Sequence, residues 1–188
     1  MTKKPQYMLT SFDKFINEIL IKEGGYVNHP DDSGGETNFG ITVEVARKHG
    51  YLGEMKRLTV DEAKSIYKLE YWLPLKLNII SSMSEQLALK IGDIGVNMGC
   101  KRAGYFLQRL LNVLNRKEKD YPDIEIDGVI GTGTLMALES FIAKRGLKGE
   151  LVLMRGLNAL QGSFYISLAE RRHKDESFMF GWLLTRVQ

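Results

Sequence analysis

The sequence has 188 residues, of which 44% are hydrophobic and 26% are charged, as in an ordinary folded globular protein. The net charge of +3 is too small to indicate a nucleic-acid-binding protein, although it would suit a polyanionic surface. The single cysteine, Cys100, excludes an intrachain disulfide and a cysteine-based zinc cage, and we expect it to be a small buried residue.

The N-terminal segment MTKKPQYMLTSF is basic but lacks the apolar stretch of a secretory signal. No run approaches the roughly 20 apolar residues of a membrane span. We therefore expect a protein that is synthesised in the cytoplasm without a classical signal peptide, with no membrane span and no nucleic-acid partner.

The first predicted helix carries one apolar stripe, formed by Phe12, Phe15, Ile16, Ile19 and Leu20. Thr10 or Ser11 can cap its start, and the glycine pair at 24–25 ends it. The only plausible β element is a short hairpin around residues 26–41. The next predicted helix starts at the capping box TVDE, residues 59–62, and its stripe continues until Pro74 breaks it.

Four further helices are expected, at residues 82–98, 103–114, 135–146 and about 149–172. Ser82 and Glu85 read as the capping box of the first of these, and Gly146 as the C-terminal end of the third. The segment IDGVIGTGT, with Asp127, resembles wall-binding repeats, but the same residues would also make an ordinary turn and an N-cap. The pattern predicts an all-α or α+β domain with one small hairpin.

The polar, glycine-rich segment EGGYVNHPDDSGGETNFGIT begins where the first helix ends, at Glu23. Glu23 follows Ile19 by four residues, so it shares the apolar face, and it lies in the last turn, at the negative end of the helix dipole. Partial burial and the dipole should both raise its pKa. A carboxylic acid that stays protonated near neutral pH can protonate the leaving oxygen of a glycoside.

A second, ionised carboxylate would be Asp32 or Asp31, in a turn where water and backbone N–H groups favour the charged form. Thr37 can help to hold a water molecule. The alternative is that Glu23 is an ordinary solvated residue and DDSGG an ordinary turn.

Other residues could contact a sugar. Tyr26, beside Glu23, offers a flat apolar face. Asn38 and Asn97 can hydrogen-bond glycan, and Asn97, one helical turn after Asp93, could equally form a structural contact. The candidate substrate-binding residues are Tyr26, Asp31, Asn38 and Asn97.

No metal site or cofactor is expected. The acids at 31, 32 and 36 do not alternate as in a calcium-binding loop, and the three histidines are scattered. The segment GVNMGCK has a cysteine where a phosphate-binding loop needs its second glycine.

Several segments resemble glycoside hydrolase family 108, which comprises phage endolysins and secretion-activator-type N-acetylmuramidases. The segment from Glu23 to Thr42 resembles the family signature, and YKLEYWLPL resembles its later YW segment. GDIGVNMGCKRAGYFLQRLLNVL, IDGVIGTGTLMAL and FMFGWLLTRV resemble its predicted peptidoglycan-binding region. A departure is Ser33, where many relatives have proline.

This resemblance implies a mainly α, lysozyme-like fold, a helical bundle with one small β-hairpin beside an active-site cleft. It implies a catalytic region at residues 1–94 and a peptidoglycan-binding helical region at 95–188, packed together as one compact unit. It also implies that Glu23 is the essential acid, and the order Glu23, Asp32, Thr37 resembles that of bacteriophage lysozymes.

The expected activity is hydrolysis of β-1,4 bonds in peptidoglycan glycan strands, in the periplasm or outside the cell, with access provided by a holin or an export system. Two alternatives remain open. One is a non-catalytic peptidoglycan-binding or secretion-accessory protein on the same fold, and the other is a chitinase or related hexosaminidase.

Overall fold

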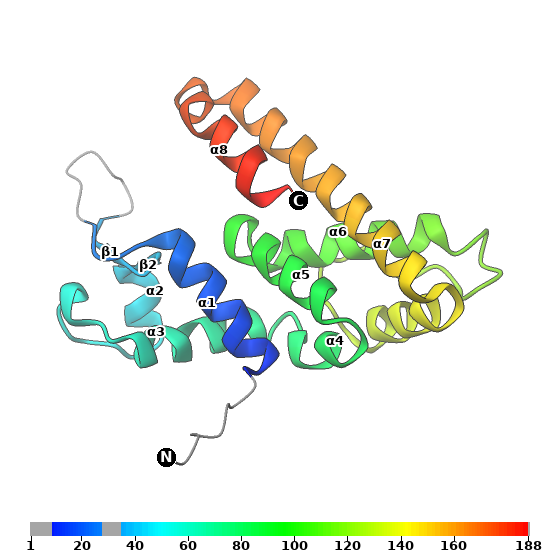
Figure 1. The fold of residues 1–188 in the computed structure, drawn as a ribbon, viewed down its shortest axis with the longest axis horizontal. Coiled ribbons are helices and arrows are strands. Elements are labelled where there is room, and N and C mark those ends of the chain that lie inside the picture. The colour runs from blue at the N-terminus through cyan, green and yellow to red at the C-terminus, as the bar shows by residue number, and fades with distance from the viewer. Residues whose placement is uncertain (1–8, 28–34, 188) are drawn as a thin grey trace, which may run out of the picture. The chain divides into compact units, whose positions relative to one another are not determined.

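The computed structural model describes residues 9–27 and 35–187, apart from the side chains of Lys22 and Glu23. This part of the chain is mainly helical and contains one small antiparallel sheet (Figure 1), so the predicted fold class is confirmed. The chain divides into two compact units, Met1–Leu73 and Pro74–Gln188, which we describe separately. The division falls before the boundary between residues 94 and 95 that the sequence suggested.

The elements of the first unit are α1 (Ser11–Glu23), β1 (Thr37–Asn38), β2 (Ile41–Thr42), α2 (Val43–Lys48), the 3-10 turn η1 (Met55–Arg57), α3 (Val60–Tyr67) and the π-helical turn η2 (Lys68–Trp72). Those of the second unit are α4 (Leu77–Met83), α5 (Glu85–Met98), α6 (Cys100–Leu114), α7 (Thr132–Arg171), the 3-10 turn η3 (His173–Asp175) and α8 (Glu176–Arg186).

Helix α1 is capped by Thr10, one of the two predicted residues. The Thr10 hydroxyl accepts a hydrogen bond from the Asp13 backbone N–H (3.1 Å), and the Asp13 carboxylate accepts one from the Thr10 N–H (3.1 Å). The rings of Phe12 and Phe15 each lie 5.3 Å from the Trp72 ring. These aromatic contacts fix α1 against η2, which defines where the C-terminal end of α1 lies in the first unit.

Helix α3 begins at the predicted capping box, in which Thr59 and Glu62 bond each other's backbone N–H groups. The expectation of one α-helix continuing to Pro74 is wrong, because α3 ends at Tyr67 and the chain continues as the π turn η2. A π turn holds more residues than an α turn, so it shifts the helical register. Trp72 is thereby buried, with 4% of its surface exposed.

The core of the second unit lies among α5, α6 and α7. It contains apolar side chains with no exposed surface, among them Leu87, Ile91, Leu107, Leu111 and Leu153. Helix α8 folds back along α7 (Figure 1), where the Trp182 ring stacks on that of Tyr165 with centroids 4.9 Å apart.

Two local predictions for the second unit need correction. The cap of α5 is Ser84, whose hydroxyl accepts from the Leu87 N–H (3.1 Å), and not Ser82, which lies within the separate helix α4. Cys100, expected to be buried, is only half-buried, because it is the first residue of α6. The break predicted at Gly146, between the helices at 135–146 and 149–172, is confirmed, because Gly146 has a non-helical backbone (φ +54°, ψ −146°) inside α7.

The segment IDGVIGTGT forms a turn around the side chain of Gln108, which is 1% exposed. Its Nε2 donates to the Asp127 carboxylate (2.8 Å) and the Val129 carbonyl (3.0 Å), and its Oε1 accepts from the Gly128 N–H (2.7 Å). The hydrogen bond from Gln108, with that from the Val129 N–H, lowers the pKa of Asp127. These contacts support the structural interpretation of the turn, although the N-cap of α7 is Gly131 rather than Asp127.

Candidate active site

Glu23 is the last residue of α1, at the position predicted for it. The helical register places it on the face that carries the buried residues Ile16 and Ile19. Gly24 ends the helix with φ +71° and ψ −160°, a conformation that is essentially restricted to glycine. The Glu23 side chain lies outside the described part of the structure, so its raised pKa stays a prediction.

An antiparallel bridge of two backbone hydrogen bonds joins Thr37 to Val27, close to the end of α1. The Val27 N–H donates to the Thr37 carbonyl (2.8 Å), and the Thr37 N–H donates to the Val27 carbonyl (2.9 Å). Val27 is only four residues beyond Glu23, and the bridge joins the two ends of the segment that contains Asp31 and Asp32. Both aspartates lie outside the described residues, and the half-buried Thr37 lies inside them.

The hairpin that carries Thr37 turns sharply at Phe39 and Gly40. Both have positive φ, +52° and +73°, as a two-residue type I′ turn requires. A bulky residue such as Phe39 is strained there, so the turn needs support from outside the hairpin. The buried Tyr67 of α3 supplies it, because its hydroxyl donates to the Phe39 carbonyl (2.9 Å).

Asn38 and Tyr26 have different surroundings. Asn38 is 4% exposed, and its side-chain amide donates to the Met55 carbonyl (2.8 Å), which supports a role in fixing β1 on η1. Tyr26 is 42% exposed and remains available to a ligand. The structure therefore separates two residues that the sequence had grouped together.

A pocket of about 410 Å³ lies beside Tyr26. Its polar lining includes Glu36, Arg47, Glu54 and Lys56. Glu54 was not among the candidates from sequence, since an isolated acid after Gly53 gave no recognisable signal. An exposed aromatic ring can pack against the face of a sugar. The charged side chains that line the same pocket can hydrogen-bond the hydroxyl and amide groups of that sugar.

A charged cluster joins the C-terminal end of α2 to η2. Glu70 accepts hydrogen bonds from Lys48 Nζ (2.8 Å) and from His49 Nε2 (2.6 Å). Partial burial opposes ionisation of Glu70, but the hydrogen bonds from Lys48 and His49 outweigh it and lower the pKa of this carboxyl group. The cluster thus stabilises the helix that follows the hairpin.

Asn97 lies in α5 of the second unit, where its amide donates to the Asp93 backbone carbonyl (2.7 Å). The Asp93 carboxylate accepts from Gln161 (3.2 Å) and pairs with Arg186 (3.3 Å). Asn97 therefore borders a network that joins α5, α7 and α8, which supports the structural alternative for this residue.

Within residues 9–27 and 35–187, no group of three or more His, Cys, Asp or Glu side chains is arranged to hold a metal ion. No helix in the same part of the chain has the length and apolar character needed to cross a membrane.

Comparison with known proteins matches two family models. Residues 16–99 match the model described as glycosyl hydrolase 108, and residues 102–187 match the model described as predicted peptidoglycan domain. The fold is similar to the structure of SagA from Brucella abortus, with a TM-score of 0.60 and 26% sequence identity. That match covers 90% of this chain and 95% of SagA. No curated protein matches the sequence.

Proposed function

Residues 16–99 belong to glycosyl hydrolase family 108 and residues 102–187 to the predicted peptidoglycan domain family, and from this premise we propose that the protein is an N-acetylmuramidase. It would cleave the β-1,4 bond that follows N-acetylmuramic acid in the glycan strand. The families support a glycoside hydrolase with a peptidoglycan-related role, and the proposal adds the bond and the residues that cleave it.

Glu23 is proposed as the general acid that protonates the glycosidic oxygen. Asp32, or Asp31 beside it, would stabilise the positive charge that develops on the sugar or position the attacking water, with help from Thr37. The observation that carries this assignment is the bridge between Val27 and Thr37. It supports the proposal because Val27 and Thr37, the paired residues that flank the segment with both aspartates, lie a few residues from the helix end that carries Glu23.

Tyr26 would contact a sugar ring, since its side chain is exposed and it lies three residues beyond Glu23, the last residue of α1. The reaction would take place at the cell wall, in the periplasm or outside the cell. Proton transfer between carboxyl groups and water requires no cofactor.

The test compares purified peptidoglycan treated with wild-type protein, Glu23→Gln and Glu18→Gln, following the appearance of new reducing ends. Glu18 is an exposed acid of the same helix and serves as the matched control. We expect Glu23→Gln to lower the rate by about 10²- to 10⁴-fold, the usual contribution of a general acid, and Glu18→Gln to have little effect. Unchanged hydrolysis by Glu23→Gln would remove Glu23 as the acid.

Two further measurements separate the alternatives. Asp31→Asn and Asp32→Asn, tested individually, identify the second carboxylate by the larger loss of rate. Chitin oligomers offered beside peptidoglycan distinguish a muramidase from a general hexosaminidase. Binding to intact sacculi without any new reducing ends would instead identify a non-catalytic wall-binding protein.

A further inference from the structure

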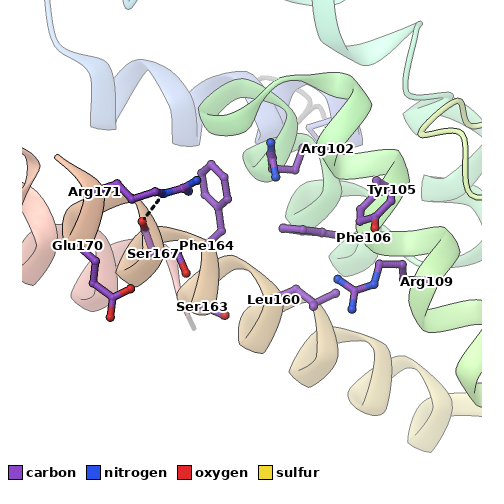
Figure 2. Close-up of a pocket in the computed structure, with 10 residues that line it drawn as sticks. All are labelled: Arg102, Tyr105, Phe106, Arg109, Leu160, Ser163, Phe164, Ser167, Glu170 and Arg171. Carbon is purple, nitrogen blue, oxygen red and sulfur yellow. Dashed lines mark hydrogen bonds between the residues drawn. The ribbon is translucent and has the colours of Figure 1, made fainter.

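A second cavity, of about 570 Å³, lies in the second unit between α6 and the C-terminal half of α7 (Figure 2). We call it the arginine cleft. The residues that define it are Arg102, Tyr105 and Arg109 of α6, and Phe164, Ser167 and Arg171 of α7. It belongs to the matched predicted peptidoglycan domain and plays no part in the chemistry proposed above.

The wall formed by α6 follows from helical spacing. Arg102, Tyr105 and Arg109 stand at positions i, i+3 and i+7, so they share one face of the helix. At about 1.5 Å per residue, the two arginine positions are separated by about 10 Å along the axis. The cleft therefore presents two positive charges to separate parts of one extended ligand.

Both of these guanidinium groups rest on aromatic rings. The Arg102 guanidinium carbon lies 4.2 Å from the centroid of Phe164, and that of Arg109 lies 5.5 Å from the centroid of Tyr105. A stacked guanidinium keeps its N–H edge free and holds the planar fork that binds a carboxylate through two parallel hydrogen bonds. In the part of the chain that the structure describes, no ion pair joins Arg102 or Arg109 to a protein carboxylate.

Arg171 adds a third positive charge, and its Nε donates to the Ser167 carbonyl (2.8 Å). Glu170 is the one acid among the lining residues, and Figure 2 shows it at the opposite end of the cleft from Arg109. With three arginines and one glutamate, the lining of the cleft has a net positive charge. Binding of a neutral glycan would not require this charge.

From this arrangement we infer that the arginine cleft binds the carboxylates of the peptidoglycan stem peptide. The inference rests on the proposed function for the identity of the polymer, peptidoglycan. It deepens that function, because it names the stem peptide, rather than the sugar, as the part that the second unit binds. A stem peptide bears several carboxylates spaced along a flexible chain, which matches two arginines whose positions are about 10 Å apart along α6.

The test measures binding by isothermal titration calorimetry. The probe is the disaccharide N-acetylglucosamine–N-acetylmuramic acid carrying a tetrapeptide, and the comparison compound is the same molecule with its peptide carboxylates amidated. Neither contains the bond that a muramidase cleaves. The proteins are wild type, Arg102→Ala, Arg109→Ala and, as the matched control, Arg155→Ala, which removes an exposed arginine of α7 outside the cleft.

We expect wild type to bind the carboxylate form about 10-fold more tightly than the amidated form. Arg102→Ala and Arg109→Ala should each weaken binding of the carboxylate form by about 10-fold, whereas Arg155→Ala should not change it. Ser163→Trp, which fills the cleft and leaves the arginines intact, should also abolish the preference for the carboxylate form over the amidated form. Thermal melts of each variant verify that the fold is retained.

Equal affinity for the two compounds, no binding of either, or equal effects of Arg155→Ala and the cleft variants would overturn the inference. Binding in the cleft can be tested independently of hydrolysis, because Glu23→Gln should lose hydrolysis and still bind the probe like wild type. Hydrolysis by wild type without carboxylate-dependent binding would reject the cleft alone. Such binding without hydrolysis would reject the muramidase proposal alone.

Discussion

Two neighbouring glycines, Gly24 and Gly25, follow Glu23, and their backbones differ. Gly24 has a positive φ, whereas Gly25 does not, and apart from chain neighbours no atom of the described residues lies within 4 Å of a Cβ placed on either. Alanine substitution at these two positions therefore mainly tests backbone conformation. A difference in stability between the two alanine variants measures how strongly the end of α1 depends on the positive φ of Gly24, which residues other than glycine rarely adopt.

We expect Gly24→Ala to lower the free energy of unfolding by about 1–3 kcal/mol, because alanine is strained at φ +71° and ψ −160°. It should also reduce peptidoglycan hydrolysis, since relief of the strain would move the helix end that carries Glu23. Gly25→Ala is the control and should change both properties much less. Urea denaturation and the reducing-end assay measure the two effects, and equal losses for both variants would contradict this explanation.

Glu70 provides a pH-dependent test at the same scale. Its folded-state pKa is lowered from 4.5, so its contribution is present above pH 4.5 and is lost as the pH falls through the folded value. We expect Glu70→Gln to lower Tm by about 2–4 °C at pH 7, as a loss of about 1 kcal/mol would. The difference in Tm between variant and wild type should narrow below pH 4.5. A constant difference from pH 7 to pH 3 would show that the charge of Glu70 is not what stabilises the protein.

At the scale of elements, the hairpin is held by side-chain hydrogen bonds to elements outside it. Asn38 of β1 bonds the Met55 carbonyl of η1, and Tyr67 of α3 bonds the carbonyl of Phe39 in the turn. A two-stranded hairpin is marginally stable alone. These tertiary contacts explain how so short a sheet can serve as the base of the segment that carries Asp31 and Asp32.

Tyr67→Phe should remove the hydrogen bond to the Phe39 carbonyl and lower the free energy of unfolding by about 1 kcal/mol. Thermal melting would detect this as a lower Tm. Tyr51→Phe is a suitable comparison, because the Tyr51 hydroxyl bonds the Glu54 carbonyl in an exposed, local contact (2.8 Å) and should matter less. A larger loss of stability in Tyr51→Phe would contradict the role given to Tyr67.

Local signals in the sequence predicted some of these elements well. Thr10 and Thr59 start helices, and Gly24 and Gly146 mark interruptions, because each depends on residues close in sequence. The hairpin was predicted around residues 26–41, and its two strands lie within residues 37–42. Ser84 was missed as a cap, since nearby Ser82 offered the same chemistry and only packing decides between them.

The candidate site was predictable to a smaller extent. The position of Glu23 at the end of α1 followed from the stripe and the glycines. The burial of Asn38 and the hydroxyl contact of Tyr67 depend on residues 17 and 28 positions away in the chain, which no local pattern specifies. The arginine cleft likewise requires α6 and α7 to meet.

At the scale of the whole molecule, the family boundary and the structural boundary differ. The glycosyl hydrolase model extends to residue 99, yet the second compact unit begins at Pro74 and contains α4 and α5. Leu87, Ile91 and Ile94 of α5 have no exposed surface. Helix α5 is therefore part of the core on which α6 and α7 depend.

This packing predicts different behaviour for two fragments. Residues 74–188 should melt cooperatively, whereas residues 102–188 should not, because loss of α5 exposes the apolar faces of α6 and α7 to water. Circular dichroism during heating distinguishes the two cases. Cooperative melting of the shorter fragment would show that the family boundary is also a folding boundary.

The bridge between Val27 and Thr37 also bears on how related enzymes could diversify. Because two backbone hydrogen bonds clamp its base, the intervening segment can change in length at a small entropic cost, about 0.6 kcal/mol for each doubling. Evolution, or a designed library of inserts, could therefore vary this segment while the scaffold stays the same, and under the proposed function such variants would differ in the glycan that they accept.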